Sequence, residues 1–205
     1  LNMKKTFAHE WACYGFWASA LQPYEDMGIF DEFDSTRCGQ LIDIVDPYAY
    51  RSRLTMPKFI INASGDDFFV SDNIQFYFSQ LTGEKYLRIV PNTNHYLSGA
   101  TTSIFQCLAS FYYAFLNNTA RPQFSWAINE DRSITVQTVT SPQTVYLWQK
   151  TNSSARDFRG TSGWGSTVLA DSGGGVYNAQ VAEPANGWTA FFVELVFAGS
   201  PYSHR

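Results

Sequence analysis

The sequence has few charged side chains, no basic cluster and no long apolar run. Lys, Arg, Asp and Glu make up 16% of the 205 residues, and the formal net charge is -4. No run of Lys or Arg is longer than the pair at residues 4–5, so the chain lacks the positive patch that attracts nucleic acids and anionic membranes. No segment approaches the ~18 apolar residues of a membrane span. We therefore expect neither nucleic acid nor a membrane span.

Cysteine is also scarce. Cys13, Cys38 and Cys107 lie far apart in the sequence and lack the paired spacing of a zinc site, so at most one disulfide could form and one thiol would remain. The Gly-rich stretch 160–175 lacks the strand-to-helix context of a phosphate-binding loop. The sequence therefore predicts no metal and no cofactor.

The first residues do not resemble a natural beginning. Residues 1–5 are not followed by the apolar block of a signal peptide. The chain starts with Leu1 and runs directly into a structured pattern, so we expect that it is truncated at this end. Three glycosylation sequons, at Asn62, Asn117 and Asn152, give weak support for secretion.

What the sequence does contain is apolar and aromatic side chains. Hydrophobic residues make up 45% and aromatic residues 17%, enough for a substantial core in one large domain or two small ones. Within residues 6–30, apolar side chains recur at helical spacing as far as Pro23, which predicts one or two amphipathic helices. A polar stretch follows. Asp46 before Pro47 then predicts the capped start of a short helix that reaches Arg53.

Residues 57–116 alternate between strand and helix patterns. The apolar run 58–63 predicts a strand buried on both faces, and 72–83 predicts a helix that ends at a glycine. A second strand is expected at 86–90 and a second helix at 104–115. A strand-helix-strand unit of this length normally joins two parallel strands by a right-handed crossover.

The composition changes after residue 120. Short strand-like runs then alternate with Gly, Pro, Ser and Asn, at 123–128, 133–139, 143–149, 166–170, 175–182 and 188–197. Such a series predicts a small antiparallel β-sandwich of immunoglobulin or fibronectin type III character. We therefore expect two domains, residues 1–120 and residues 121–205.

Acidic and histidine side chains follow the two predicted parallel strands. Asp66 and Asp67 come after the first strand, and His95 comes after the second. Because the carboxyl ends of parallel strands share one edge of a sheet, a carboxylate there could reach the imidazole, fix its tautomer and stabilise its protonated form. Asp66 is the preferred acid. Asp67 is the alternative acid, or binds backbone amides in the turn, since an acidic pair after a strand is often an ordinary turn or cap.

The nucleophile that such a pair would serve is absent from the sequence. A serine nucleophile sits on a sharp elbow, usually Gly-x-Ser-x-Gly, earlier in the chain than the acid. The serines before Asp66 lack flanking glycines, and Ser162 comes too late. The nucleophile therefore lies in a missing N-terminal portion, or the protein uses none. His9, on the early helix, and His204, in the terminal tail, compete poorly with His95.

An ordered set of motifs resembles the PhoPQ-activated pathogenicity-related protein family. The motifs are Asp46–Tyr50, Leu54–Lys58, Ala63–Phe69, Val90–His95 and Gly187–Glu194. The resemblance implies an α/β fold class, with residues 1–120 as the C-terminal half of an α/β-hydrolase-like parallel sheet and helices, followed by the β-sandwich. It also implies export to the periplasm or the extracellular space. By position, Asp66 would be the acid and His95 the base, and family members commonly have Asp-Glu at residues 66–67.

These features predict a fragment of a serine-triad hydrolase that acts on an ester or amide bond and is inactive alone. Its expected partners are a small-molecule or peptide substrate and the missing N-terminal half. Two alternatives stay open. One is an exported signalling or interaction protein on an inactive hydrolase-like scaffold. The other is carbohydrate binding through exposed Trp148, Trp164 or Trp188, although core packing is the expected fate of Trp148 and Trp188.

Overall fold

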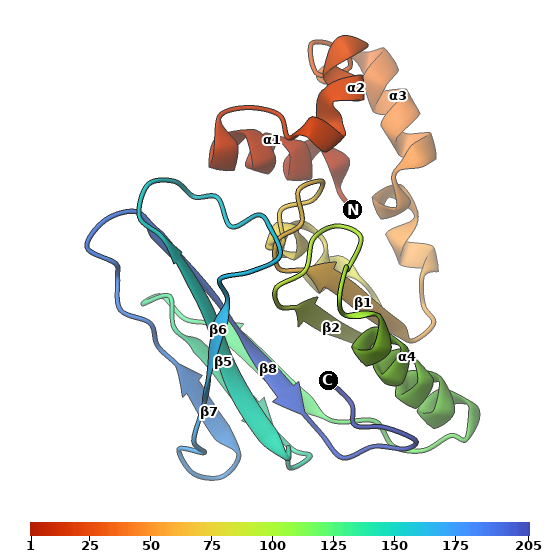
Figure 1. Cartoon of the computed structure of the whole chain (residues 1–205). Helices are drawn as coiled ribbons and strands as arrows, with labels where there is room; N and C mark the ends of the chain where they lie inside the picture. The colour runs from red at the N-terminus through yellow and green to blue at the C-terminus, as the bar shows by residue number, and fades with distance from the viewer.

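A computed structural model describes all residues, 1–205. Helices dominate the first third of the chain, a short parallel sheet with one helix follows, and antiparallel strands form the rest (Figure 1). The α-helices are α1 (Met3–Tyr14), α2 (Gln22–Asp26), α3 (Thr36–Val45) and α4 (Thr101–Leu116). The strands are β1 (Lys58–Ala63), β2 (Lys85–Val90), β3 (Phe124–Ile128), β4 (Ile134–Thr138), β5 (Thr144–Asn152), β6 (Gly165–Val168), β7 (Val176–Ala179) and β8 (Trp188–Val196).

The helical first third differs in detail from the predicted pattern. Helix α1 ends at Tyr14, because Gly15 adopts a left-handed conformation with φ 74° and closes the helix. Pro23 does not end a helix but lies in the first turn of α2, where its missing N–H costs nothing. Helix α3 lies in the polar stretch before Asp46, where the sequence predicts no helix. Ser35 caps it, with its side-chain oxygen accepting from Cys38 N.

The predicted short helix at residues 46–53 is confirmed as a 3-10 helix, Pro47–Arg53. Asp46 is its cap, with Oδ1 accepting from Tyr48 N at 3.0 Å. The same buried carboxylate also accepts from Met3 N at 2.6 Å. Asp46 therefore joins the start of α1 to the segment that leads into β1.

Strands β1 and β2 are parallel, as predicted, with Lys58 opposite Lys85 and Ala63 opposite Val90. The connection between them is not the continuous helix expected at 72–83. It forms two 3-10 turns, Asn73–Phe76 and Phe78–Gln80, because Tyr77 has φ -146° and interrupts the helical path. Helix α4 follows as predicted and packs on the pair of strands, with Phe59 and Phe111 stacked at 5.5 Å.

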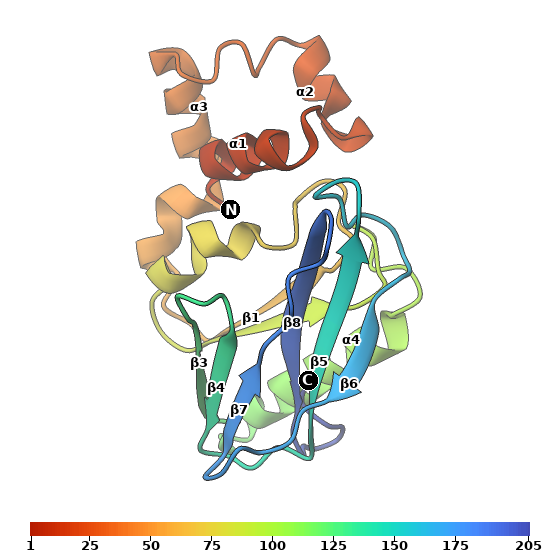
Figure 2. The same ribbon diagram turned by 90° about the vertical axis from the view of Figure 1, so that its left-hand side faces the viewer.

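The antiparallel strands expected after residue 120 are present at six positions. They form two three-stranded sheets, ordered β3-β4-β7 and β6-β5-β8 (Figure 2). Val136 and Tyr177 of the first sheet pack with Val145 of the second in one buried cluster. The sheets therefore bury apolar residues against each other.

The predicted fold class was wrong for this chain. An extended α/β-hydrolase-like sheet needs several parallel strands, but the only parallel sheet here has two. Residues 1–57 supply helices and no further strand. The division at residue 120 stays a prediction. Hydrogen bonds cross it, including Ser110 Oγ donating to Tyr202 O at 2.6 Å.

Charged side chains hold α1 against the rest of the chain. His9 Nε2 lies 2.9 Å from Asp72 Oδ1, and Arg156 Nη2 donates to Asp72 Oδ2 at 2.6 Å. The sulfur of Cys13 contacts both His9 and Arg156. Hydrogen bonds to Asp72 and Cys13 raise the pKa of His9 to about 9. Burial alone would raise the pKa of Asp72, but its bonds with His9 and Arg156 lower it instead.

This cluster predicts a loss of stability at alkaline pH. The pKa of folded His9 lies above the ordinary value of 6.5, so its stabilisation is fully present below about pH 6.5 and is lost as pH rises through about 9. Because the Asp72 side chain is 42% exposed, we expect a contribution of about 1 kcal/mol. Urea unfolding at pH 6.5 and pH 10 measures it. In His9→Gln this alkaline loss of stability should be absent, and an identical alkaline loss in both proteins would contradict the assignment.

Candidate functional site

The structure brings Asp66 and His95 together at the carboxyl ends of β1 and β2. Asp66 comes three residues after the end of β1, and His95 comes five residues after the end of β2. His95 Nδ1 lies 3.1 Å from Asp66 Oδ1 and 3.2 Å from Oδ2. The two strands start in register and run the same way, so their following loops meet at one edge.

Backbone amides fix the orientation of the Asp66 carboxylate. Its Oδ1 accepts from Phe68 N at 2.8 Å and from Phe69 N at 2.9 Å. The alternative prediction, that Asp67 binds the turn amides, is wrong, because Asp66 binds the amides and the imidazole with one carboxylate. No hydrogen bond to Asp67 is present in the structure.

Aromatic rings surround the imidazole of His95. Phe68 stacks on it with ring centroids 5.2 Å apart and an interplanar angle of 30°. Phe69 and Tyr96 approach it edge-on, at 5.8 Å and 5.6 Å. These contacts and the bond to Asp66 set both the position and the tilt of the ring. Nε2, on the other side of the ring, has no hydrogen-bond partner within the chain, and the side chain is 37% exposed.

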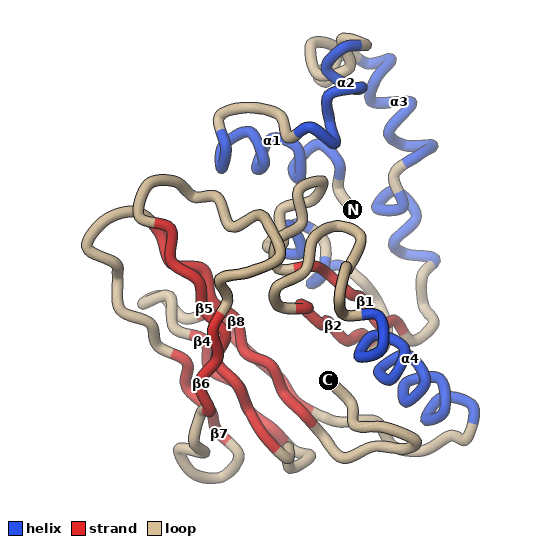
Figure 3. Tube along the Cα trace, viewed as in Figure 1, coloured by secondary structure: helices blue, strands red, loops and turns tan.

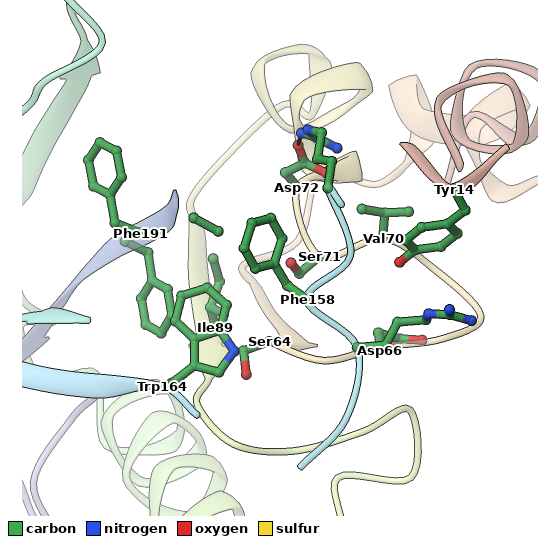
Figure 4. Close-up of a pocket in the computed structure, with 14 residues that line it drawn as sticks. Tyr14, Ser64, Asp66, Val70, Ser71, Asp72, Ile89, Phe158, Trp164 and Phe191 are labelled. Carbon is green, nitrogen blue, oxygen red and sulfur yellow. Dashed lines mark hydrogen bonds and ion pairs between the residues drawn. The ribbon is translucent and has the colours of Figure 1, made fainter. Parts of the chain in front are cut away.

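Two cavities adjoin the Asp66 carboxylate. The larger cavity has a volume of about 290 Å³ and is lined by His95 as well as Asp66. Its other lining residues are mostly apolar: Leu1, Ile61, Ala63, Phe69, Tyr77 and Leu97, with Asn62 and Asn73. Its volume is close to the lower limit for small-molecule sites. The smaller, of about 100 Å³, lies beside Ser64 and among aromatic side chains (Figure 4).

None of the serines considered as nucleophiles contacts His95. Ser64, the nearest in sequence to Asp66, is buried, and its Oγ accepts from Asn92 N at 2.9 Å. Ser35 caps α3. His9 pairs with Asp72 and not with the Asp66 carboxylate. The chain therefore contains an acid and a histidine in contact, and no serine is hydrogen-bonded to Nε2.

Metal-ligating side chains do not gather anywhere in the structure. No group of three or more His, Cys, Asp or Glu side chains has the geometry to hold a metal ion. The three cysteines are unpaired thiols, and Cys38 and Cys107 are buried.

The tryptophans considered for carbohydrate binding have different surroundings. Trp164 is buried, with 6% of its surface exposed, so the prediction that it is exposed was wrong. Trp148 donates to Glu194 Oε2 at 2.8 Å and stacks on Phe192. Trp188 is 47% exposed, so the prediction that it packs in the core was wrong.

The Asp66 turn yields a stability prediction. In Asp66→Ala the amides of Phe68 and Phe69 lose their acceptor, and we expect the free energy of unfolding to fall by about 2–4 kcal/mol. Asp67→Ala is the matched control, because no hydrogen bond is lost, and should change stability by about 0.5 kcal/mol or less. Urea unfolding compares them. Equal losses in both variants would show that the turn does not depend on Asp66.

Comparisons with known proteins place the chain in a family. The model of the PhoPQ-activated pathogenicity-related protein family matches residues 1–159. The autocrine proliferation repressor protein A of Dictyostelium discoideum is 33% identical over 220 aligned residues, which cover 96% of this chain and 44% of that protein. The chain therefore belongs to the PhoPQ-activated pathogenicity-related family. It spans less than half the length of this relative, and no solved structure matches it.

None of the helices combines the length and the apolar composition needed to cross a bilayer.

Proposed function

We propose that Asp66 and His95 are the acid and the base of a serine-triad hydrolytic site that cleaves an ester or amide bond. The serine would come from a part of the protein outside these 205 residues, and the greater length of the relative leaves room for it. The observation that carries the proposal is the 3.1 Å contact between Asp66 Oδ1 and His95 Nδ1. The other ring nitrogen, Nε2, has no partner in the chain and is free to act on a substrate.

The geometry suits proton transfer at His95 Nε2. With Asp66 accepting from Nδ1–H, the neutral imidazole keeps a lone pair on Nε2 and can take the proton of an attacking hydroxyl. Asp66 then stabilises the imidazolium and keeps its orientation. The proton passes from Nε2 to the leaving group when the tetrahedral intermediate breaks down. The mostly apolar cavity beside His95 would hold part of the substrate.

Labelling of the intact protein with a serine-reactive fluorophosphonate tests this proposal. We expect one modified serine in the wild-type protein, and no labelling in His95→Ala, because the hydroxyl then has no base. Absence of labelling in the wild-type protein, or labelling that persists unchanged in His95→Ala, would contradict the triad.

Two aspartate variants sharpen the test. Asp66→Asn retains an oxygen for the turn amides but presents its NH₂ group to Nδ1 of the ring. This favours the tautomer with the proton on Nε2, which cannot act as a base, and we expect the labelling rate to fall about 10³–10⁴-fold. Asp67→Asn should label at about the wild-type rate. The reverse order would assign the acid to Asp67.

A second candidate function is an exported signalling or interaction protein on a catalytically inactive scaffold. The printed name of the relative, a proliferation repressor, favours it. Loss of that activity in Asp66→Asn and His95→Ala would favour the enzyme, and full activity in both would favour the scaffold. Carbohydrate binding has less support, because Trp164 is buried and Trp148 is bonded to Glu194.

We also propose export, on the basis of the family resemblance. If the protein passes through a glycosylating secretory pathway, Asn117 should carry a glycan, because it lies exposed at the end of α4. Asn62 should not, because it lies within β1 and is only partly exposed. Peptide mapping by mass spectrometry after enzymatic deglycosylation distinguishes the two sites. A glycan on Asn62 would contradict the placement of that strand.

A further inference from the structure

A long segment between two strands of the β-rich half lies against the Asp66 turn. We call residues 153–164, which connect β5 to β6, the strap. Figures 1 and 3 show it as a loop that leaves the sheet and passes beside the ends of β1 and β2. Lys150 fixes its shape from within the sheet, because Nζ donates to the carbonyl oxygens of Phe158, Arg159 and Ser162 at 3.3, 3.2 and 3.0 Å.

The strap contacts the acid turn through two glycines. Gly160 N donates to Gly65 O at 3.2 Å, while Gly65 N donates to Thr93 O at 2.9 Å. Gly65 therefore lies between the strap on one side and the loop of His95 on the other. A Cβ atom at Gly65 would lie 1.9 Å from Gly160 O, so only glycine permits this approach. Asp66 is the next residue in the chain.

The strap contacts the histidine loop through one side chain. Asn92 Oδ1 accepts from Trp164 N at 2.9 Å, and Asn92 Nδ2 donates to Trp164 O at 3.0 Å. Asn92 N also donates to Ser64 Oγ at 2.9 Å. Asn92 has φ 55°, a left-handed conformation that asparagine tolerates better than most residues. His95 follows three residues later.

We propose that Asn92 is a positioning residue for the Asp66–His95 pair, and that the strap is thereby part of the functional site. The proposal rests on the proposed function, since it assigns the geometry of the same acid and base. Asn92 ties the histidine loop to both the acid turn and the strap, and Gly65 ties the acid turn to the same two segments. Acid–base geometry tolerates only about 0.5 Å of error, and a displacement of about 1 Å can cost about 10²-fold in rate.

The first test compares two asparagines of the same conformation. Asn118 also has a left-handed backbone, with φ 50°, but its side chain makes no hydrogen bond in the structure. Asn92→Gly and Asn118→Gly therefore make the same change in a tolerant backbone, and only the first removes the two bonds to Trp164. In the intact protein we expect Asn92→Gly to lower the limiting rate of fluorophosphonate labelling about 10–100-fold, with little change in the half-saturating concentration. Asn118→Gly should match the wild-type protein.

The second test loosens the strap without touching the pair. Lys58 and Lys150 each donate to three backbone carbonyls, but Lys58 lies at the far end of β1 from Asp66. Lys150→Met should lower the limiting labelling rate several-fold, and Lys58→Met should not, when both are compared at the same folded fraction. Equal effects in both lysine variants would show that the strap has no special influence, and would overturn the proposal.

A measurement independent of activity separates this proposal from the proposed function. With the histidines labelled with ¹⁵N, the Nδ1–H proton of His95 bonded to Asp66 should give a downfield NMR signal protected from exchange. Asn92→Gly should weaken or broaden this signal, and Asn118→Gly should not. If the wild-type protein is not labelled by fluorophosphonate but Asn92→Gly still changes the signal, the hydrolytic function fails and the positioning role stands. An unchanged signal and an unchanged labelling rate in Asn92→Gly would overturn the positioning role.

Discussion

The arrangement of the candidate site depends on the backbone contact between Gly65 and Gly160. Gly65 is held on both sides by backbone hydrogen bonds, because its N–H donates to Thr93 O and its carbonyl oxygen accepts from Gly160 N. A side chain at this position would collide with the Gly160 carbonyl. Two segments distant in sequence therefore position the acid turn, and they also position Asp66 because it is the next residue in the chain.

Hydrogen bonds of two aspartate side chains join the helical first third to this arrangement. Asp72, in the loop that follows the acid turn, binds His9 of α1 and Arg156 of the strap. Asp46 joins the start of α1 to the segment before β1. Three regions of the chain thus meet around the loops of a two-stranded sheet. Their contacts explain how so small a parallel sheet can hold an aspartate and a histidine in a defined relation.

The acid–histidine geometry and the fold class are separate matters. The extended hydrolase-like sheet is absent from this chain, yet two parallel strands are enough to bring one loop from each to a common edge. Family membership, with less than half the length of the relative covered, is compatible with a nucleophile elsewhere in the protein. The contact of Asp66 with His95 is therefore the part of the functional argument that these residues carry themselves.

Short-range patterns in the sequence account for most of the local elements. The apolar runs at 58–63 and 86–90 predicted β1 and β2, the Asp46 cap was correctly placed, and the alternation after residue 120 predicted six antiparallel strands. Because parallel strands share an edge, the sequence also predicted that Asp66 and His95 would meet. It could not show that Tyr77 would break the predicted helix, that Asp66 and not Asp67 would bind the turn amides, or that residues 153–164 would contact the acid turn and the histidine loop. The place of residues 153–164 depends on contacts between segments about 70–95 residues apart, such as Asn92 with Trp164 and Gly65 with Gly160, and no local pattern of propensity or spacing encodes which distant backbone a side chain will meet. The turn amides and the break at Tyr77 are local, but the acidic pair at residues 66–67 fits either carboxylate in the turn, and the helical spacing at 72–83 does not reveal the extended φ of one residue.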